Sequence, residues 1–280
     1  MKNFFEYSGS ELNNFAKALN WKKYYFELCF KYFDKRYDVL EIGAGIGSMS
    51  KLFINNVKFN SWTCVEPDKK NFIKLKKNFI DLSSYKNVYF FNNTVNDFIK
   101  TKNNYDLIFM ADVLEHLEND KDILNKLFKK LRSGGNIIIF VPACQFLFSD
   151  FDKKIGHFRR YSFDTLLNIL PRSAIILDLK YIDSVGFFAS LINKLIMKES
   201  SPSLKQILFW DRIIVPLSKI FDKFFSLNVK ILSTTFGAVV GIEILLEESK
   251  SGEEIVNVWS FVVMESIQNS TESEGWFRTI

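Results

Sequence analysis

The chain has 280 residues, and 48% of them are apolar, which excludes a wholly disordered protein and predicts one large domain or one domain with an elaboration. Its net charge of +5 comes from 37 basic and 32 acidic residues that are scattered along the sequence. A nucleic-acid-binding surface usually concentrates its basic residues in one stripe, so no nucleic-acid partner is indicated.

The cysteines and the lengths of the apolar runs indicate in which cellular compartment we expect the protein. Cys29, Cys64 and Cys144 are an odd number without a C-x-x-C pair, which predicts reduced thiols and an intracellular protein. The amino-terminal residues show no secretory signal, and no apolar run reaches the roughly 20 residues that cross a bilayer. We therefore expect a cytoplasmic protein that is soluble or peripheral to a membrane.

Hydrophobic periodicity predicts alternating helices and strands. Apolar residues at helical intervals over 10–33 predict helices before the first strand, so residues 1–34 are expected to form an N-terminal helical cap at the cofactor mouth. Further helices are predicted at 47–55, 68–81 and 119–131, and one that begins after Ser162. Strands are predicted at 37–42, 61–66, 87–92, 105–111, 136–141, 174–183 and 238–246. This order predicts an α/β fold with a doubly wound, mostly parallel, seven-stranded Rossmann-like sheet and helices on both faces.

The region before the last strand is longer than this fold needs. Within a domain expected at 35–250, residues from about 185 to 233 are predicted to be a helical insert. Over 204–228, aliphatic and aromatic residues recur at helical spacing among basic residues. Such a segment either packs on the domain, as stripes of this kind usually do, or rests on a membrane as a basic amphipathic surface. Residues 251–280 are expected to be a loosely ordered C-terminal tail without an assigned role.

The segment after the first strand predicts a nucleotide-type cofactor site. Gly43, Gly45 and Gly47 allow the backbone to turn sharply into a helix and allow a ligand to approach closely. Ser48 stands where the dinucleotide fingerprint has its third glycine, and the Glu41 carboxylate would repel a pyrophosphate and attract a cation. S-adenosylmethionine carries a sulfonium and an ammonium group and no phosphate, so it fits this turn better than NAD.

At these residues the chain resembles the class I S-adenosylmethionine-dependent methyltransferases, whose first motif is acid-x-Gly-x-Gly-x-Gly. Residues 105–116 resemble the fourth strand and following loop of that family, and residues 131–142 resemble its glycine turn and fifth strand. The resemblance covers roughly residues 37–180. It implies S-adenosylmethionine as the cofactor and methyl transfer as the activity.

The cofactor contacts are expected at the ends of the first four strands. The glycine turn would hold the methionine portion, and an acid at the end of the second strand would accept hydrogen bonds from two ribose hydroxyls. The adenine is expected beside residues 94–96, although the acid common there in the family is displaced to Asp97. The candidate cofactor-binding residues are Glu41, Gly43, Ala44, Gly45, Gly47, Glu66, Pro67, Thr94, Val95 and Ala111.

The two histidines of the chain both follow strands, at the edge where ligands bind in this architecture. His116 follows the fourth strand, near the expected methyl group, and is a candidate catalytic base. The alternative is that it begins a helix and bonds only to nearby backbone. Asp112 is a candidate substrate-binding residue, with helix capping as its alternative.

The loop after the fifth strand is similar to a Gly-His-x-Arg-Arg-Tyr-Ser segment found in a bacterial branch of these methyltransferases. Here it occupies residues 156–162. Arg159, Arg160 and Tyr161 are candidate substrate-binding residues, because paired guanidinium groups suit an anionic acceptor. The alternative is that both arginines pair with nearby acids and fix the loop. His157 is the second candidate base.

The sequence therefore predicts methyl transfer from S-adenosylmethionine, most plausibly to oxygen, on a small-molecule or lipid- or sugar-linked acceptor. The alternatives are an NAD-dependent oxidoreductase and a non-catalytic cofactor-binding scaffold at a membrane, contacted through residues 204–228. No metal is expected, because the two histidines are far apart in sequence and neither an H-x-x-x-H motif nor a cysteine cluster is present.

Overall fold

The computed structural model describes residues 12–79, 85–192, 202–226 and 241–248. The predicted tail at 251–280 lies outside the described residues, as do residues 1–11 of the predicted cap and parts of the predicted insert.

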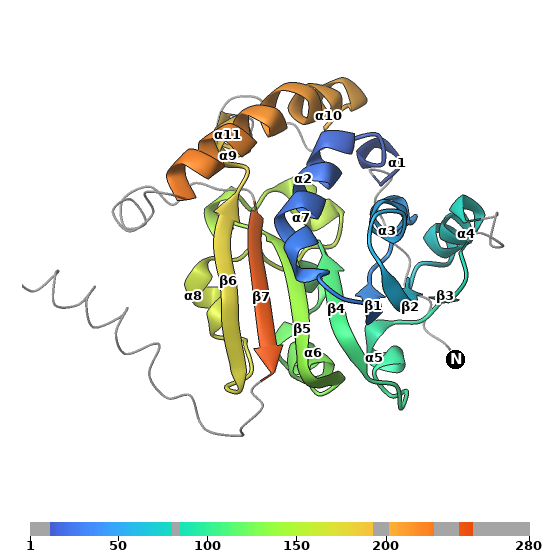
Figure 1. Ribbon diagram of the computed structural model, residues 1–280. Coiled ribbons are helices and arrows are strands. Elements are labelled where there is room, and N and C mark those ends of the chain that lie inside the picture. The colour runs from blue at the N-terminus through green and yellow to red at the C-terminus, as the bar shows by residue number, and fades with distance from the viewer. Residues whose placement is uncertain (1–11, 80–84, 193–201, 227–240, 249–280) are drawn as a thin grey trace, which may run out of the picture.

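The described strands form one mixed sheet in the order β3-β2-β1-β4-β5-β7-β6 (Figure 1). The five strands from β3 to β5 pair in parallel, and β7 runs antiparallel to both of its neighbours. The strands are β1 (Tyr37–Ile42), β2 (Phe59–Val65), β3 (Val88–Phe91), β4 (Tyr105–Ala111), β5 (Leu131–Pro142), β6 (Ala174–Ile182) and β7 (Gly241–Glu248). The strand order reverses between β1 and β4, which is where open α/β sheets bind their ligands.

Helices connect the strands and cover both faces of the sheet. Those up to β4 are α1 (Leu12–Phe15), α2 (Leu19–Cys29), η1 (Phe30–Tyr32), α3 (Ser48–Ile54), α4 (Lys69–Asn78) and α5 (Val95–Phe98). Between β4 and β6 lie η3 (Leu114–His116), α6 (Asp120–Phe128), η4 (Gln145–Leu147), α7 (Asp150–Lys154) and α8 (Phe163–Leu167). After β6 come α9 (Ser184–Ile192), α10 (Leu204–Phe209), the π-helical segment η6 (Trp210–Ile214) and α11 (Val215–Ser226). Among the described residues, no helix is both long and apolar enough to span a bilayer.

The apolar run of β4 explains why the sheet is covered on two sides. Ile108 and Met110 belong to a buried cluster that includes α6 residues, whereas Leu107 and Phe109 belong to a second cluster that includes Phe53 of α3. Successive side chains of a strand point to opposite faces, so a continuous apolar run requires a helical layer on each face.

The first helices of the chain, α1 and α2, meet the later helical segments α10, η6 and α11 above the carboxyl ends of the parallel strands (Figure 1). Asp211 of η6 provides the contact: its carboxylate accepts hydrogen bonds from the amides of Leu19, at 3.1 Å, and Trp21, at 2.9 Å. These amides belong to the first turn of α2 and have no partner within that helix, so a residue distant in sequence acts as its N-cap. The Trp21 and Trp210 rings pack beside this cap with their centroids 5.9 Å apart.

The structure confirms the predicted Rossmann-like α/β fold and its parallel sheet. β1 and β4 have the predicted bounds, and Ser162 caps α8 through the Thr165 amide. The prediction for β5 was wrong at its start, because the strand begins at Leu131 and contains the glycine pair that suggested a turn. A register shift between β4 and β5 accommodates this pair, as irregularities in a strand often do.

Candidate functional site

A cavity of about 1730 Å³ opens at the carboxyl ends of β1, β2 and β4. The β1–α3 turn and the ends of these strands form one wall, and α1, α2, α9 and α10 contribute others. Ligand pockets for drug-sized molecules occupy about 300–1,000 Å³, so this cavity has room for a nucleotide-sized cofactor together with an acceptor.

The three glycines of the β1–α3 turn have different tasks. All three have positive φ, at 73° for Gly43, 57° for Gly45 and 80° for Gly47. A Cβ on Gly43 or Gly47 would approach within 2.3 Å of Val113 and 2.5 Å of Leu75, respectively, so both allow close packing. Gly47 does not belong to the cavity lining that the described residues form. Gly45 lines the cavity, and a Cβ there would meet its nearest neighbour only at 3.9 Å, so this is the glycine that leaves space for a ligand.

Glu66 lies at the end of β2 and faces the turn. Its two carboxylate oxygens accept hydrogen bonds from the amides of Gly45, at 2.7 Å, and Asp68, at 2.9 Å. Burial raises the pKa of Glu66 to about 7, although these amide donors oppose the shift. The carboxylate lines the cavity at the position predicted for the ribose, and each oxygen has capacity for a further donor.

Glu41 lies deeper than the sequence suggested. Its carboxylate accepts hydrogen bonds from the Ser50 hydroxyl, at 2.8 Å, and the Trp62 indole, at 2.7 Å, and thereby links β1 to α3 and β2. Burial raises the pKa of Glu41 despite these donors. The residue borders the cavity, but its described contacts are structural, and the methionine-binding role stays a prediction.

Other predicted cofactor-binding residues also line the cavity. Pro67, Val95 and Ala111 line it, as do Ala44 and Thr94. The Thr94 hydroxyl also accepts a hydrogen bond from the first turn of α5 and so fixes where that helix begins.

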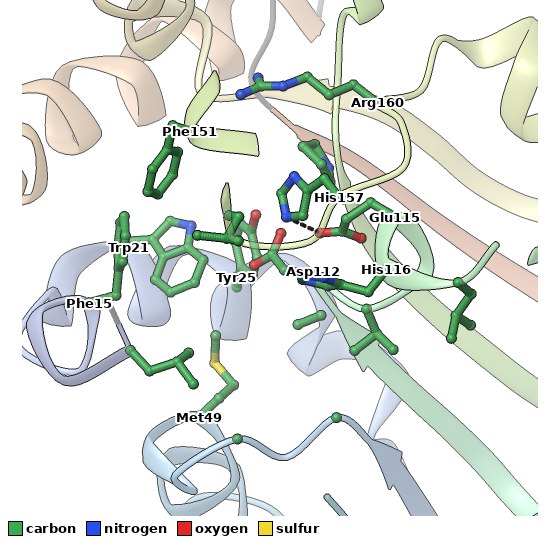
Figure 2. Close-up of a pocket in the computed structure, with 18 of the residues that line it drawn as sticks. Phe15, Trp21, Tyr25, Met49, Asp112, Glu115, His116, Phe151, His157 and Arg160 are labelled. Atoms are coloured by element: carbon green, nitrogen blue, oxygen red, sulfur yellow. Dashed lines mark ion pairs between the residues drawn. The ribbon is translucent and has the colours of Figure 1, made fainter. Parts of the chain in front are cut away.

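The two histidines, distant in sequence, meet on the cavity wall. The ring centroids of His116 and His157 are 4.5 Å apart, and Nε2 of His157 is 3.7 Å from a carboxylate oxygen of Glu115 (Figure 2). The ligand atoms of Glu115, His116 and His157 all lie within 4.8 Å of one another. The argument against a metal assumed that the two histidines lie apart, but the fold brings their loops together. Asp112, with a φ of 54°, points toward the same space.

Burial perturbs the pKa values of this cluster. It raises the pKa of Asp112 to about 7 and that of Glu115 well above its ordinary value, and the repulsion between the two carboxyl groups adds to the shift of Glu115. Burial and the neighbouring His157 lower the pKa of His116 to about 4.

The structure corrects two of the predicted substrate-binding residues. Arg159 pairs with Asp120 at 2.6 Å, and the buried Tyr161 hydroxyl donates to the same carboxylate at 2.8 Å. Neither side chain is part of the cavity lining formed by the described residues. The physical reason is that the buried Asp120 requires donors, which these two residues supply.

Arg160 borders the cavity, but its guanidinium is engaged. It donates to both carboxylate oxygens of Asp152, at 2.9 and 3.0 Å. Oδ1 of Asp152 also lies 2.9 Å from Nδ1 of His157. The carboxylate that pairs with Arg160 therefore also orients the imidazole of His157. Burial alone would raise the pKa of Asp152, but hydrogen bonds from His157 and Arg160 outweigh it and hold that pKa below its ordinary value.

Several lining residues were not predicted from the sequence. Phe15, Trp21 and Tyr25 form an aromatic side of the cavity (Figure 2), and Glu115 completes the histidine cluster. Glu115 precedes His116 directly, which was an available signal for a shared site. The aromatic residues showed only helical spacing, which buried core residues share.

One family model matches part of the chain. The sequence profile described as "Methyltransferase domain" matches residues 40–137. These residues contain the glycine turn, Glu66 and the β4 loop. Together with the fold, the match supports an S-adenosylmethionine-dependent methyltransferase. A search among curated proteins found no match.

Solved structures share the fold at low identity. The N-methyltransferase NodS from Bradyrhizobium japonicum WM9, in complex with S-adenosyl-L-homocysteine, is 10% identical with a TM-score of 0.53; the match covers 86% of this chain and 94% of NodS. Coclaurine N-methyltransferase, bound to N-methylheliamine and SAH, is 12% identical with a TM-score of 0.54 over 82% of this chain and 72% of its own.

The (4+2)-cyclase SpnF is 13% identical with a TM-score of 0.55 and covers 81% of this chain and 80% of its own. Methyltransferases and a cyclase therefore share this architecture, so the fold alone does not determine the reaction.

Proposed function

We propose that the protein transfers the methyl group of S-adenosylmethionine to an oxygen atom of a small-molecule or lipid- or sugar-linked acceptor. The observation that carries this proposal is that one cavity contains both the Gly45–Glu66 end of the sheet and the cluster of Glu115, His116 and His157. The first supplies a cofactor position, and the second supplies groups that can handle the proton of an acceptor.

The residues at the turn fit S-adenosylmethionine better than NAD. Glu66 offers carboxylate oxygens to a ribose diol, and Gly45 leaves open space beside it. Asp112 adds a carboxyl group that would stabilise a sulfonium when ionised. A pyrophosphate at the same rim would face these acids, so the oxidoreductase alternative is disfavoured. When bound, the cofactor supplies an electrophilic methyl carbon, and this chain holds and orients it.

The proposed reaction is a direct displacement. The acceptor hydroxyl loses its proton, its oxygen forms a bond to the methyl carbon, and the carbon–sulfur bond breaks with its electron pair remaining on sulfur. His116 and His157 are the proposed proton acceptors, and Glu115 lies beside them. A hydroxyl needs such assistance because its oxygen is weakly nucleophilic until the proton leaves.

The cavity walls indicate the acceptor. Phe15, Trp21, Tyr25 and Phe151 line the cavity and favour an apolar or aromatic acceptor body (Figure 2). The Arg160 guanidinium is already paired with a carboxylate, which weakens the earlier hypothesis of an anionic acceptor.

Calorimetric titration and product analysis would test this function. We expect the purified chain to bind S-adenosylmethionine and not NAD, and Glu66→Ala to weaken binding about tenfold or more through the lost ribose contacts. Matched alcohol and amine acceptors with one aromatic scaffold, incubated with methyl-labelled cofactor, would then show which atom receives the label. Binding of NAD alone would overturn the proposal, and cofactor binding without transfer to any acceptor would favour the non-catalytic scaffold.

We further propose that the acceptor is lipid-linked or glycan-lipid-linked and is reached from a membrane surface. The helices α10 to α11 expose Phe209, Ile213, Leu217, Ile220 and Phe221, with Ile220 67% exposed. Apart from the adjacent Ile220 and Phe221, these residues are spaced by three or four positions, so they form one apolar stripe, whereas Ile207 and Val215 pack inward. The predicted membrane-contacting segment ends at 228, and its last two residues lie outside the described ones.

Vesicle flotation of the full chain would test the membrane contact. We expect the chain to float with vesicles that contain anionic lipids and Ile213→Gln with Ile220→Gln to remain in the soluble fraction. Leu19→Gln, which replaces an exposed leucine outside the stripe, is the matched control and should float like the wild type. A wild-type chain that stays soluble would contradict the membrane proposal without bearing on cofactor binding.

A further inference from the structure

A buried carboxyl group without a hydrogen-bond partner lies on the wall of the cavity. Glu115 is 0% exposed, and neither of its carboxylate oxygens hydrogen-bonds to any of the described residues. An ionised carboxylate in this situation has lost its hydration without gaining a hydrogen bond in return. A cation beside Glu115 would compensate the buried negative charge, and it could reach the carboxylate through the cavity.

The neighbouring imidazoles point suitable atoms at this carboxylate. Nδ1 of His157 is 2.9 Å from Asp152, and Nδ1 of His116 is 3.2 Å from the carbonyl oxygen of Gly156. A carboxylate and a carbonyl only accept hydrogen bonds, so each Nδ1 is the donor of its contact, and in the neutral imidazole Nε2 then holds the lone pair. Nε2 of His157 faces Glu115 at 3.7 Å (Figure 2, dashed line).

Outer contacts hold this arrangement in place. Asp152 is fixed by two hydrogen bonds from Arg160, and the amide of Phe158 donates to the carbonyl of Glu115 at 2.8 Å. The Phe158 contact and the contact of His116 with Gly156 thus tie the loop to the β4 loop on both sides of His157. Imidazoles that bind metals commonly donate their second nitrogen to a carboxylate or a backbone carbonyl, which is the pattern of both histidines here.

We propose that Glu115, His116 and His157 bind a divalent transition-metal ion of the Zn²⁺ class at the acceptor end of the cavity. Two imidazole nitrogens and a carboxylate oxygen suit Zn²⁺, Mn²⁺ or Fe²⁺, whereas Mg²⁺ prefers oxygen ligands. Asp112, which points toward the same space, is the nearest additional carboxylate. Three protein ligands leave a coordination position that opens on the cavity.

The role of the ion, unlike its binding, rests on the proposed function. A divalent cation beside the transferred methyl would bind the acceptor oxygen and favour loss of its proton. The two histidines would then be ligands and not proton acceptors, which replaces the base role proposed for them above.

Titration of the metal-free full chain with Zn²⁺, in the absence of cofactor and acceptor, tests the site directly. The protein should be tag-free and treated with a chelator before calorimetry. We expect one equivalent of Zn²⁺ to bind, with an affinity about tenfold or more weaker in Glu115→Gln and in His157→Gln. Glu118→Gln is the matched control, because this exposed glutamate borders the same cavity three residues later, and it should bind as the wild type does.

A spectroscopic readout separates ligation from a merely structural effect. The chain has two histidines, so long-range ¹H–¹⁵N correlation spectra can resolve all four imidazole nitrogens. Zn²⁺ should shift both Nε2 signals and leave both Nδ1–H tautomers in place. Absence of saturable Zn²⁺ binding, or equal binding by wild type, Glu115→Gln and His157→Gln, would overturn the proposal. Because cofactor and acceptor are absent, either result is independent of whether methyl transfer occurs.

Discussion

Alanine substitutions at two glycines of the same turn should have opposite consequences. Gly47→Ala places a methyl group 2.5 Å from Leu75 and 3.0 Å from Phe79, both fully buried. Gly45→Ala places one in the cavity, with its nearest neighbour, Leu12, at 3.9 Å. Both positions have positive φ, so both variants carry a backbone cost of about 1–2 kcal/mol.

The difference between the variants isolates the packing contribution. Forcing a methyl group into a filled core costs about 1–3 kcal/mol, and about 2 kcal/mol lowers the melting temperature of a domain of this size by about 4–8 °C. We therefore expect Gly47→Ala to melt that much lower than Gly45→Ala. Cofactor affinity should fall about tenfold or more in Gly45→Ala, because its methyl group takes ligand space, and change little in Gly47→Ala.

Thermal denaturation and calorimetric titration of both variants with S-adenosylmethionine would check this expectation. The two measurements should rank the variants in opposite orders. Equal melting temperatures, or a loss of affinity confined to Gly47→Ala, would refute the division of tasks within the turn.

Further predictions concern pH, capping and thiol reactivity. Since burial raises the pKa of Glu66 to about 7, its contribution to stability is fully present below pH about 4.5 and is lost as pH rises through 7. The ribose needs the ionised form, so calorimetric affinity for S-adenosylmethionine should increase through pH 7 in the wild type. The increase should be smaller in Glu66→Gln, where Asp112 still ionises near that pH. Asp211→Ala should cost about 1–2 kcal/mol in denaturant unfolding and accelerate amide exchange at Leu19 and Trp21, and unchanged exchange would contradict the capping role. Burial raises the pKa of the Cys64 thiol well above its ordinary value, so a thiol reagent should modify Cys64 only after unfolding, as mass spectrometry would show.

Local sequence patterns predicted the fold because they determine it directly. The apolar run of β4 and the glycine turn after β1 each specify a conformation within a few residues. The start of β5 was missed, because Gly134 and Gly135 are typical of turns and only the neighbouring strand makes an irregular strand favourable there.

The site was less predictable, because it depends on contacts between distant segments. The meeting of His116 and His157 follows from the way the loop after β5 folds, and this depends on the pairing of Asp152 with Arg160. Arg159 was predicted to bind the substrate because a guanidinium binds anions well. In the structure, its guanidinium forms an ion pair with the buried Asp120. Pairing between buried charges is decided in three dimensions, and the linear sequence offers several partners for each.

The capping of α2 by Asp211 bears on how the protein is made. Chains leave the ribosome from the amino end, and their segments begin to fold in that order. Helix α2 emerges long before Asp211 exists, so its first turn has no N-cap until the chain has been synthesised past η6. The wall of the cavity that α1, α2 and α10 form together is therefore completed only after the parallel core of the sheet has emerged.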